Sequence, residues 1–91
     1  MDRKEFKRQG AIKWNGYTFK YYSQNVLPGN GLDIPGRHVD NYFVCDGDGY
    51  ICVATHKNQF NKGDIVNTPF GQGKVYDRCQ SYNVIDIYTD F

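Results

Sequence analysis

The stretch Val84-Ile85-Asp86-Ile87-Tyr88 reads as a buried β-strand with one acid in its middle. Strands rarely contain Asp unless a neighbouring group or a function retains it. Because side chains alternate along a strand, we expect Ile85 and Ile87 to face the core and Asp86 to face a groove or the solvent. Tyr88 lies on the same face as Asp86. The stretch therefore predicts a carboxylate held rigidly on one side of a β-sheet.

Turn signals divide the rest of the chain into short strands. Asn15-Gly16, between two apolar runs, is a strong hairpin signal, and Asp46-Gly47-Asp48-Gly49 marks a second hairpin. A long Pro/Gly loop without periodicity occupies residues 23–41. The expected strands are 11–14, 17–22, 42–45, 50–54, 64–67, 73–77 and 84–89, and residues 55–60 could supply one helical turn. Six or seven short strands predict an all-β fold, a small barrel or sandwich.

Length and composition limit the architecture. Ninety-one residues make one domain with a modest core, which we place at 11–91 after a polar N-terminal lead-in at 1–10. Aromatic residues make up 16% of the chain, with eight Tyr and six Phe. That content suits β-strands and surfaces that face sugars or proteins better than helix bundles.

The charge balance argues against polyanionic partners. Eleven basic and ten acidic side chains give a formal net charge of +1, so we expect no nucleic acid partner. The basic run from Arg3 to Arg8 predicts a solvated tail, with a phosphate-binding arm as the alternative. No signal peptide is recognisable, and no stretch approaches the ~20 apolar residues of a membrane span, so we expect no membrane insertion.

The cysteines and histidines do not form a recognisable reactive or metal site. Cys45 and Cys52 flank the second hairpin turn, where either a strained disulfide or two buried free thiols could form, whereas Cys79 lies in a loop. His38 and His56 lack metal-ligand spacing with each other or with a cysteine. We therefore expect no metal. Neither Cys45 nor Cys52 has the setting of a nucleophile, and Asp46-Gly47-Asp48-Gly49 lacks the further ligands of a calcium loop, which favours a plain turn.

Asp77 and Asp86 form the best candidate pair for catalysis. Asp77 ends the strand that precedes Asp86, and we expect both acids in one C-terminal hairpin, on one side of the sheet. Two carboxylates in a groove are the usual apparatus of glycosidic cleavage, in which burial or a neighbouring charge raises one pKa and makes that group a general acid.

The C-terminal half resembles the three-aspartate domain. The likeness covers residues 50–91 and part of the first hairpin, and it is carried by Ala54-Thr55, Lys62-Gly63-Asp64-Ile65-Val66, Thr68-Pro69-Phe70-Gly71, Lys74-Val75-Tyr76-Asp77 and Ile85-Asp86-Ile87-Tyr88. This resemblance implies a six-stranded double-psi β-barrel related to membrane-bound lytic transglycosylase A and, more remotely, to rare-lipoprotein-A-like proteins and expansins. The loop from Leu27 to His38 is similar to loops in small cell-wall-related domains of phages and prophages of Gram-positive bacteria.

The resemblance also implies an activity on peptidoglycan. By position, Asp86 matches the catalytic acid and base, and Asp77 lines the same groove. One carboxyl would protonate the oxygen between N-acetylmuramic acid and N-acetylglucosamine, then accept the C6 hydroxyl proton as a 1,6-anhydro ring closes, without a cofactor. The implied partners are the glycan strand and other phage structural proteins, and the implied location is the virion or the host cytoplasm, with action at the cell wall. From position and chemistry, the candidate substrate-binding groups are His38, His56, Lys74 and Tyr88.

Two other functions stay open because the chain departs from the family. Where the family has its first aspartate, this chain has Ala54-Thr55-His56, and the loop over residues 78–83 is shorter. A non-catalytic wall-binding or tail module would use an aromatic surface of Trp14, Tyr17, Tyr21 and Tyr22. A small phage-encoded inhibitor of a host protein is the third interpretation.

Overall fold

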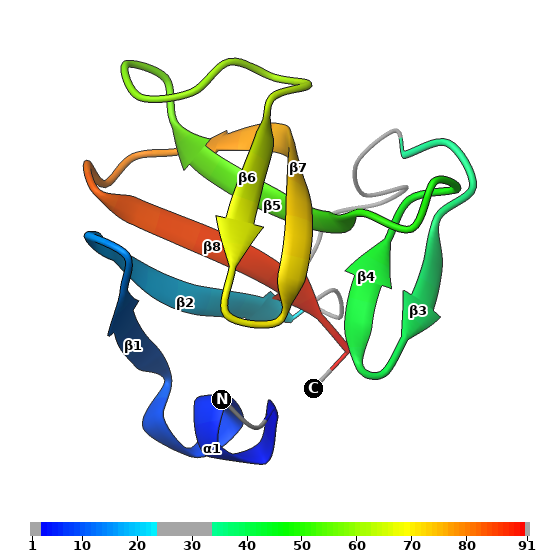
Figure 1. Cartoon of the computed structure of the whole chain (residues 1–91), viewed down its shortest axis with the longest axis horizontal. Helices are drawn as coiled ribbons and strands as arrows, with labels where there is room; N and C mark the ends of the chain where they lie inside the picture. Colours follow the sequence, from blue (N-terminus) through cyan, green and yellow to red (C-terminus); the bar gives the residue numbers. More distant parts are fainter. Residues whose placement is uncertain (1–2, 24–33, 91) are drawn as a thin grey trace.

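A curled, mixed β-sheet forms a half-barrel and makes up most of the molecule (Figure 1). The computed structural model describes residues 3–23 and 34–90. Within these residues the elements are α1 (Arg3–Gln9), β1 (Ala11–Trp14), β2 (Tyr17–Ser23), β3 (His38–Asp40), β4 (Phe43–Cys45), β5 (Ile51–His56), β6 (Ile65–Thr68), β7 (Gly71–Cys79) and β8 (Val84–Thr89). The predicted small all-β barrel class is confirmed.

Each of the seven expected strands is present, and the structure adds β3 inside the expected loop. Three residues without alternation give no sequence signal, and β3 exists because it pairs with β4. Asn15 and Gly16 have φ values of 52° and 86°, which is the left-handed turn expected between β1 and β2. The Leu27-to-Gly31 part of the predicted loop lies outside the described residues.

The pairing of the last two strands differs from the expected C-terminal hairpin. The order of the sheet is β1-β2-β8-β4-β5-β7-β6, and β5 also pairs with β8. Strand β5 therefore lies between β7 and β8, parallel to β7 and antiparallel to β8. Strand β2 runs parallel to β8 on its other side. A local reading assigns a hairpin to two neighbouring strands, whereas here the long-range pairing through β5 is preferred.

The two faces of the sheet carry separate apolar clusters. The inner cluster includes the fully buried Phe19, Val53 and Ile87. The outer cluster contains Ile34, Val44, Cys52, Ala54 and Tyr88. Ile85 and Ile87 belong to the inner cluster and Tyr88 to the outer one, so the predicted alternation along β8 is confirmed.

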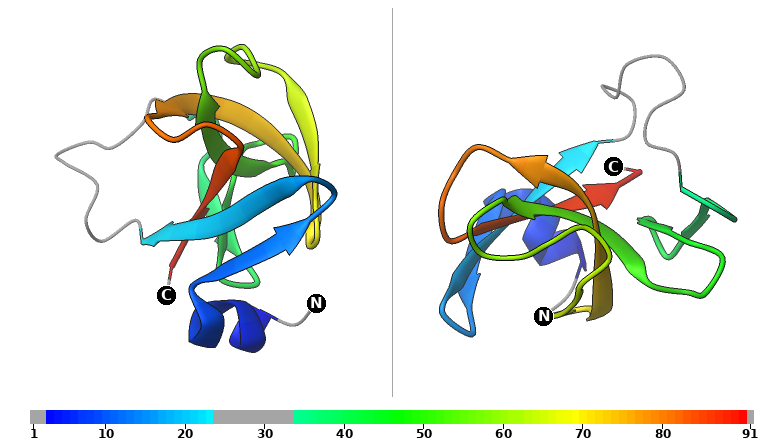
Figure 2. Two further views of the ribbon diagram at one scale, coloured as in Figure 1. Left: turned by 90° about the vertical axis from the view of Figure 1, so that its left-hand side faces the viewer. Right: turned by 90° about the horizontal axis from the view of Figure 1, so that it is seen from above.

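The N-terminal segment is a helix and not a solvated tail. Helix α1 covers one end of the curled sheet (Figure 2). Its Phe6 is fully buried. The centroid of the Phe6 ring lies 5.5 Å from that of Tyr21 and 5.1 Å from that of Phe70. Seven residues are too few to show a helical period in the sequence, and one aromatic side chain anchors the charged run. In the described part of the chain, no helix is both long enough and apolar enough to cross a bilayer.

The second hairpin turn keeps Cys45 and Cys52 apart. Asp46 N donates to Tyr50 O at 3.0 Å, and Cys45 pairs with Ile51 across the hairpin. Cys45 therefore belongs to the inner cluster and Cys52 to the outer one. Both thiols are free and buried, and Cys79 is free and partly exposed. The disulfide alternative is wrong for this structure.

The predicted turn at Asp46 is confirmed. Its Oδ1 accepts hydrogen bonds from Asp48 N at 3.0 Å and Tyr50 N at 2.9 Å, and Oδ2 accepts one from the Tyr76 hydroxyl at 2.7 Å. Burial alone would raise the pKa of Asp46, but these hydrogen bonds lower it overall. Across residues 3–23 and 34–90, no three His, Cys, Asp or Glu side chains gather in a way that could hold a metal ion.

Candidate functional site

Asp77 and Asp86 lie in one row across the outer face of the sheet. Ala54 on β5 pairs with Asp77 on β7 and with Asp86 on β8, and Asp86 pairs with Lys20 on β2. Directly paired residues place their side chains on the same face. The row therefore reads Asp77, Ala54, Asp86, Lys20, with the small methyl group of Ala54 between the two acids.

A pocket of about 300 Å³ opens over this row. We call it the acidic pocket. The two acids, Tyr22 and Tyr88 line it together with Arg78 and Gln80, and Ala54 and Cys79 complete the lining. The sequence prediction that the two acids share one groove agrees with this geometry, although the strands that carry them are not neighbours.

Asp86 is the more unusual of the two acids. Its side chain is partly buried in the acidic pocket, and burial raises the pKa of the carboxyl, with the Lys20 charge opposing the shift. Within the described residues, no donor forms a hydrogen bond to its carboxylate. Buried polar groups normally have hydrogen-bond partners. Asp86 lacks one in the described residues, so burial favours its protonated form and its carboxyl oxygens can bind a ligand.

Asp77 is anchored by two donors. Its Oδ1 accepts a hydrogen bond from Arg78 N at 2.8 Å, and its Oδ2 accepts one from the Tyr88 hydroxyl at 3.3 Å. Burial, together with the charge and hydrogen bond of Asp77, raises the pKa of Tyr88 well above its usual range. The phenol therefore stays protonated and acts as a donor. The pair thus combines a carboxylate fixed by two donors with an acid that accepts no hydrogen bond from residues 3–23 and 34–90.

A β-bulge in β7 brings Asp77 to this face. Val53 pairs with Val75 and Ala54 with Asp77, which leaves Tyr76 as the extra residue on β7. Regular alternation would have placed Asp77 with Val75 in the inner cluster. Because a bulge adds one residue to one strand only, it moves the following side chain to the other face.

The other predicted substrate-binding residues are spread over the molecule. Tyr88 lies in the acidic pocket and His56 in the pocket beside it. His38 lies on β3, where its Nδ1 is 2.9 Å from Gly36 O. Lys74 lies with its Nζ 5.8 Å from the centroid of the Tyr76 ring. His38 and Lys74 therefore do not line the acidic pocket.

Sequence reasoning missed four members of the acidic pocket, namely Ala54, Arg78, Cys79 and Gln80, as site residues. Burial chiefly raises the pKa of Cys79, and the charges of Asp86 and Asp77 raise it further, so the thiol is no ready nucleophile. Arg78, Cys79 and Gln80 are the three residues that follow Asp77 in the chain. That adjacency was the one signal available, and it becomes meaningful only when the end of β7 is known to border the pocket.

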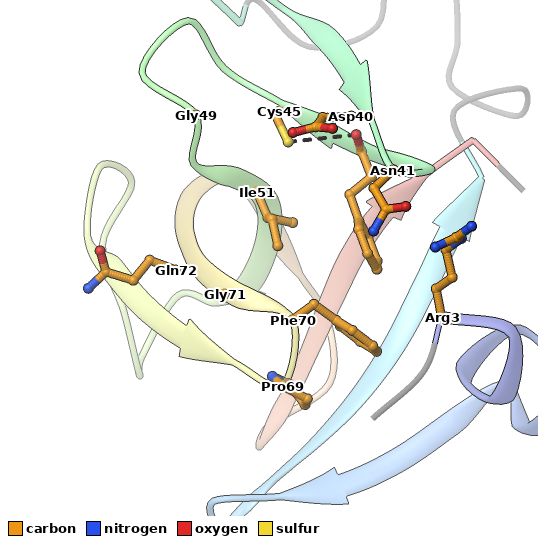
Figure 3. A pocket seen from close by; sticks show the side chains of 11 residues that line it. Arg3, Asp40, Asn41, Cys45, Gly49, Ile51, Pro69, Phe70, Gly71 and Gln72 are labelled. Carbon is orange, nitrogen blue, oxygen red and sulfur yellow. Dashed lines mark hydrogen bonds between the residues drawn. The ribbon is translucent and has the colours of Figure 1, made fainter.

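A larger pocket, of about 470 Å³, lies between the β3–β4 hairpin and the β6–β7 turn (Figure 3). Phe43, Ile51 and Phe70 contribute apolar side chains to its lining, and Arg3 and Asp40 contribute charged ones. It holds one exposed acid and no second carboxylate within its lining. Its volume exceeds that of the acidic pocket, but its lining has a single carboxylate and the acidic pocket has two, so we assign the candidate site to the acidic pocket.

Comparisons with known proteins leave the chain without an assigned family. No family model matches it, and neither a curated protein nor a solved structure gives a match. The resemblance to the three-aspartate domain therefore stays a hypothesis, and the arguments for function come from the geometry of the acidic pocket.

Proposed function

We propose that the chain binds a glycan strand in the acidic pocket and cleaves a glycosidic bond with Asp86 as general acid and base. The observation that carries this proposal is the state of Asp86, an acid with a raised pKa and no hydrogen-bond partner in the described residues, open to a pocket. A general acid works best when its pKa lies close to the working pH. The resemblance adds peptidoglycan as the substrate and a phage or prophage as the context.

The hydrogen bonding of the two acids favours a mechanism with one titrating carboxyl. Asp77 accepts two hydrogen bonds, whereas in the described residues Asp86 accepts none and its pKa is raised by burial. Protonated Asp86 would donate its proton to the glycosidic oxygen as the bond from C1 breaks. The C6 hydroxyl of the same sugar would then bond to C1 and return its proton to the Asp86 carboxylate.

The remaining residues of the acidic pocket have positioning roles in this proposal. Asp77, held by Arg78 N and the Tyr88 hydroxyl, can accept hydrogen bonds from sugar hydroxyls. Tyr22 is 40% exposed, with its ring centroid 5.8 Å from that of Tyr88, and presents a flat apolar surface for a sugar ring.

Glycan binding without cleavage is the second candidate function. Ala54 favours it, because this apolar residue occupies the centre of the row between the two acids. A binder would use the same walls and aromatic surface while the acids served only as hydrogen-bond acceptors. Both candidates predict binding in the acidic pocket, and they differ in the product.

Mass spectrometry of peptidoglycan digests separates the two candidates. We expect the wild-type protein to release 1,6-anhydro-muropeptides and Asp86→Asn to release none, because the amide cannot donate the required proton. Asp40→Asn, in the larger pocket, is the matched control and should leave the product unchanged. Co-sedimentation with peptidoglycan without soluble product would support the binder. Loss of product in Asp40→Asn alone would place the site in the other pocket.

A further inference from the structure

A second pocket extends the acidic pocket along the end of β7. We call it the basic pocket, and it measures about 340 Å³. Arg78, Cys79 and Gln80 line both pockets, and His56 and Lys57 complete the basic one. The shared residues make the two hollows neighbouring parts of one groove. A ligand longer than a single sugar in the acidic pocket would therefore reach the basic pocket.

The lining of the basic pocket supplies cationic and neutral donors and no carboxylate. In the described part of the chain, the Arg78 guanidinium and the Lys57 ammonium take part in no ion pair or hydrogen bond. Asn58 N donates to His56 Nδ1 at 3.2 Å, which places the imidazole proton on Nε2 and leaves that atom as a donor. A pocket with several uncommitted donors and no acid is suited to an anion.

An exposed aromatic ring contacts one of the residues that line the basic pocket. The Tyr82 ring meets His56 edge to face, with centroids 5.4 Å apart, and the tyrosine is 63% exposed. An exposed ring beside cationic donors can stack on a sugar while the donors bind its charged substituent. The acidic neighbour and the net charge of +1 disfavour a polyanion such as nucleic acid.

We propose that the basic pocket is a subsite for a carboxylate-bearing sugar next to the one held by Asp77 and Asp86. Arg78 and Lys57 would bind the carboxylate, and His56 Nε2 would donate a further hydrogen bond. The inference rests on the proposed function, because it assumes a glycan in the acidic pocket. It adds that the groove selects a peptide-free stretch of the strand, in which a neutral N-acetylglucosamine lies beside Asp77 and Asp86 and the neighbouring muramic acid has a free lactyl carboxylate.

Binding measurements in the Asp86→Asn background test the subsite without cleavage. The probes are peptide-free chains of alternating N-acetylglucosamine and N-acetylmuramic acid and the same chains with the lactyl carboxyl reduced to an alcohol. By titration calorimetry we expect the carboxylate form to bind roughly tenfold more tightly, since a charge-assisted hydrogen bond is lost with the reduced form. Added salt should weaken the preference.

Charge-removing variants assign the preference to the basic pocket. Arg78→Gln should lower the affinity for the carboxylate form and leave that for the reduced form unchanged. Lys57→Gln, in the exposed turn after β5, should have the same effect from a position outside β7. Lys13→Gln, an exposed lysine on β1, is the control and should retain the preference. Equal binding of both forms overturns the subsite but keeps the glycan site. Absence of binding to either form overturns both proposals, whereas a carboxylate preference without anhydro product supports the subsite and contradicts cleavage.

Discussion

Asp86 and Asp77 show how the same residue type acquires two states from its surroundings. Asp77 accepts two hydrogen bonds, whereas Asp86 is partly buried with the Lys20 charge as the opposing influence on its pKa. Two neighbouring carboxyls with such different hydrogen bonding and burial are typical of acid–base sites. The sequence predicted the direction in which Asp86 points, because alternation along β8 is regular, but its solvation depends on the strands on either side.

The raised pKa of Asp86 predicts a pH-dependent effect on stability. A folded-state pKa above the unfolded value means that ionised Asp86 destabilises the fold. This cost is absent below the unfolded pKa of about 4 and appears as pH rises through the folded value. We expect Asp86→Asn to increase the free energy of unfolding relative to wild type more at about pH 7 than at about pH 3. Urea unfolding at both pH values measures it, and Asp40→Asn, fully on the surface of β3, is the control. The same difference at both pH values would contradict the assigned burial.

Some elements of the site can be predicted from local sequence patterns, and others cannot. The strand at β8 and the hairpin at Asn15-Gly16 follow from local pattern, and both are present. The bulge at Tyr76 leaves no mark in the sequence, because Val75, Tyr76 and Asp77 also fit a regular strand. Without the bulge, Asp77 would point into the inner cluster. The candidate acids were therefore predictable, but the reason they share a pocket was not.

Gly36 predicts a stability effect at the contact between two turns. Its φ is +69°, and a Cβ there would lie 2.5 Å from Gly47 Cα, while Gly47 N donates to Pro35 O at 2.8 Å. Gly16 also has positive φ but open space around its Cβ position. We expect Gly16→Ala to cost about 1 kcal/mol from the backbone conformation alone and Gly36→Ala to cost roughly 1–3 kcal/mol more. Chemical denaturation measures both, and equal costs would show that the two turns separate easily.

At the scale of the whole molecule, long-range parallel pairing joins distant segments. Strand β2 pairs with β8, and β5 lies between β7 and β8. Residues such as Lys20 and Asp86 become neighbours through these pairs, although 65 positions separate them in the chain. No periodicity within a short window carries that information. This is why the class of fold could be predicted from the sequence, whereas the order of the strands could not.

Helix α1 covers one end of the half-barrel, and its buried aromatic residue leads to a prediction about stability. Phe6 is fully buried and, with Phe43, Phe70 and Tyr21, belongs to the aromatic part of the inner cluster. Removing its ring leaves a cavity at the end of the sheet, so Phe6→Ala should lower the free energy of unfolding by about 3–5 kcal/mol. Arg8→Ala, on the exposed face of α1, removes only an exposed ion pair with Glu5 and should lower stability far less than Phe6→Ala. Thermal and urea unfolding measure both variants. If Phe6→Ala unfolds at the wild-type midpoint, α1 is not part of the cooperative fold, because a docked helix would transmit the loss of its anchor to the whole barrel.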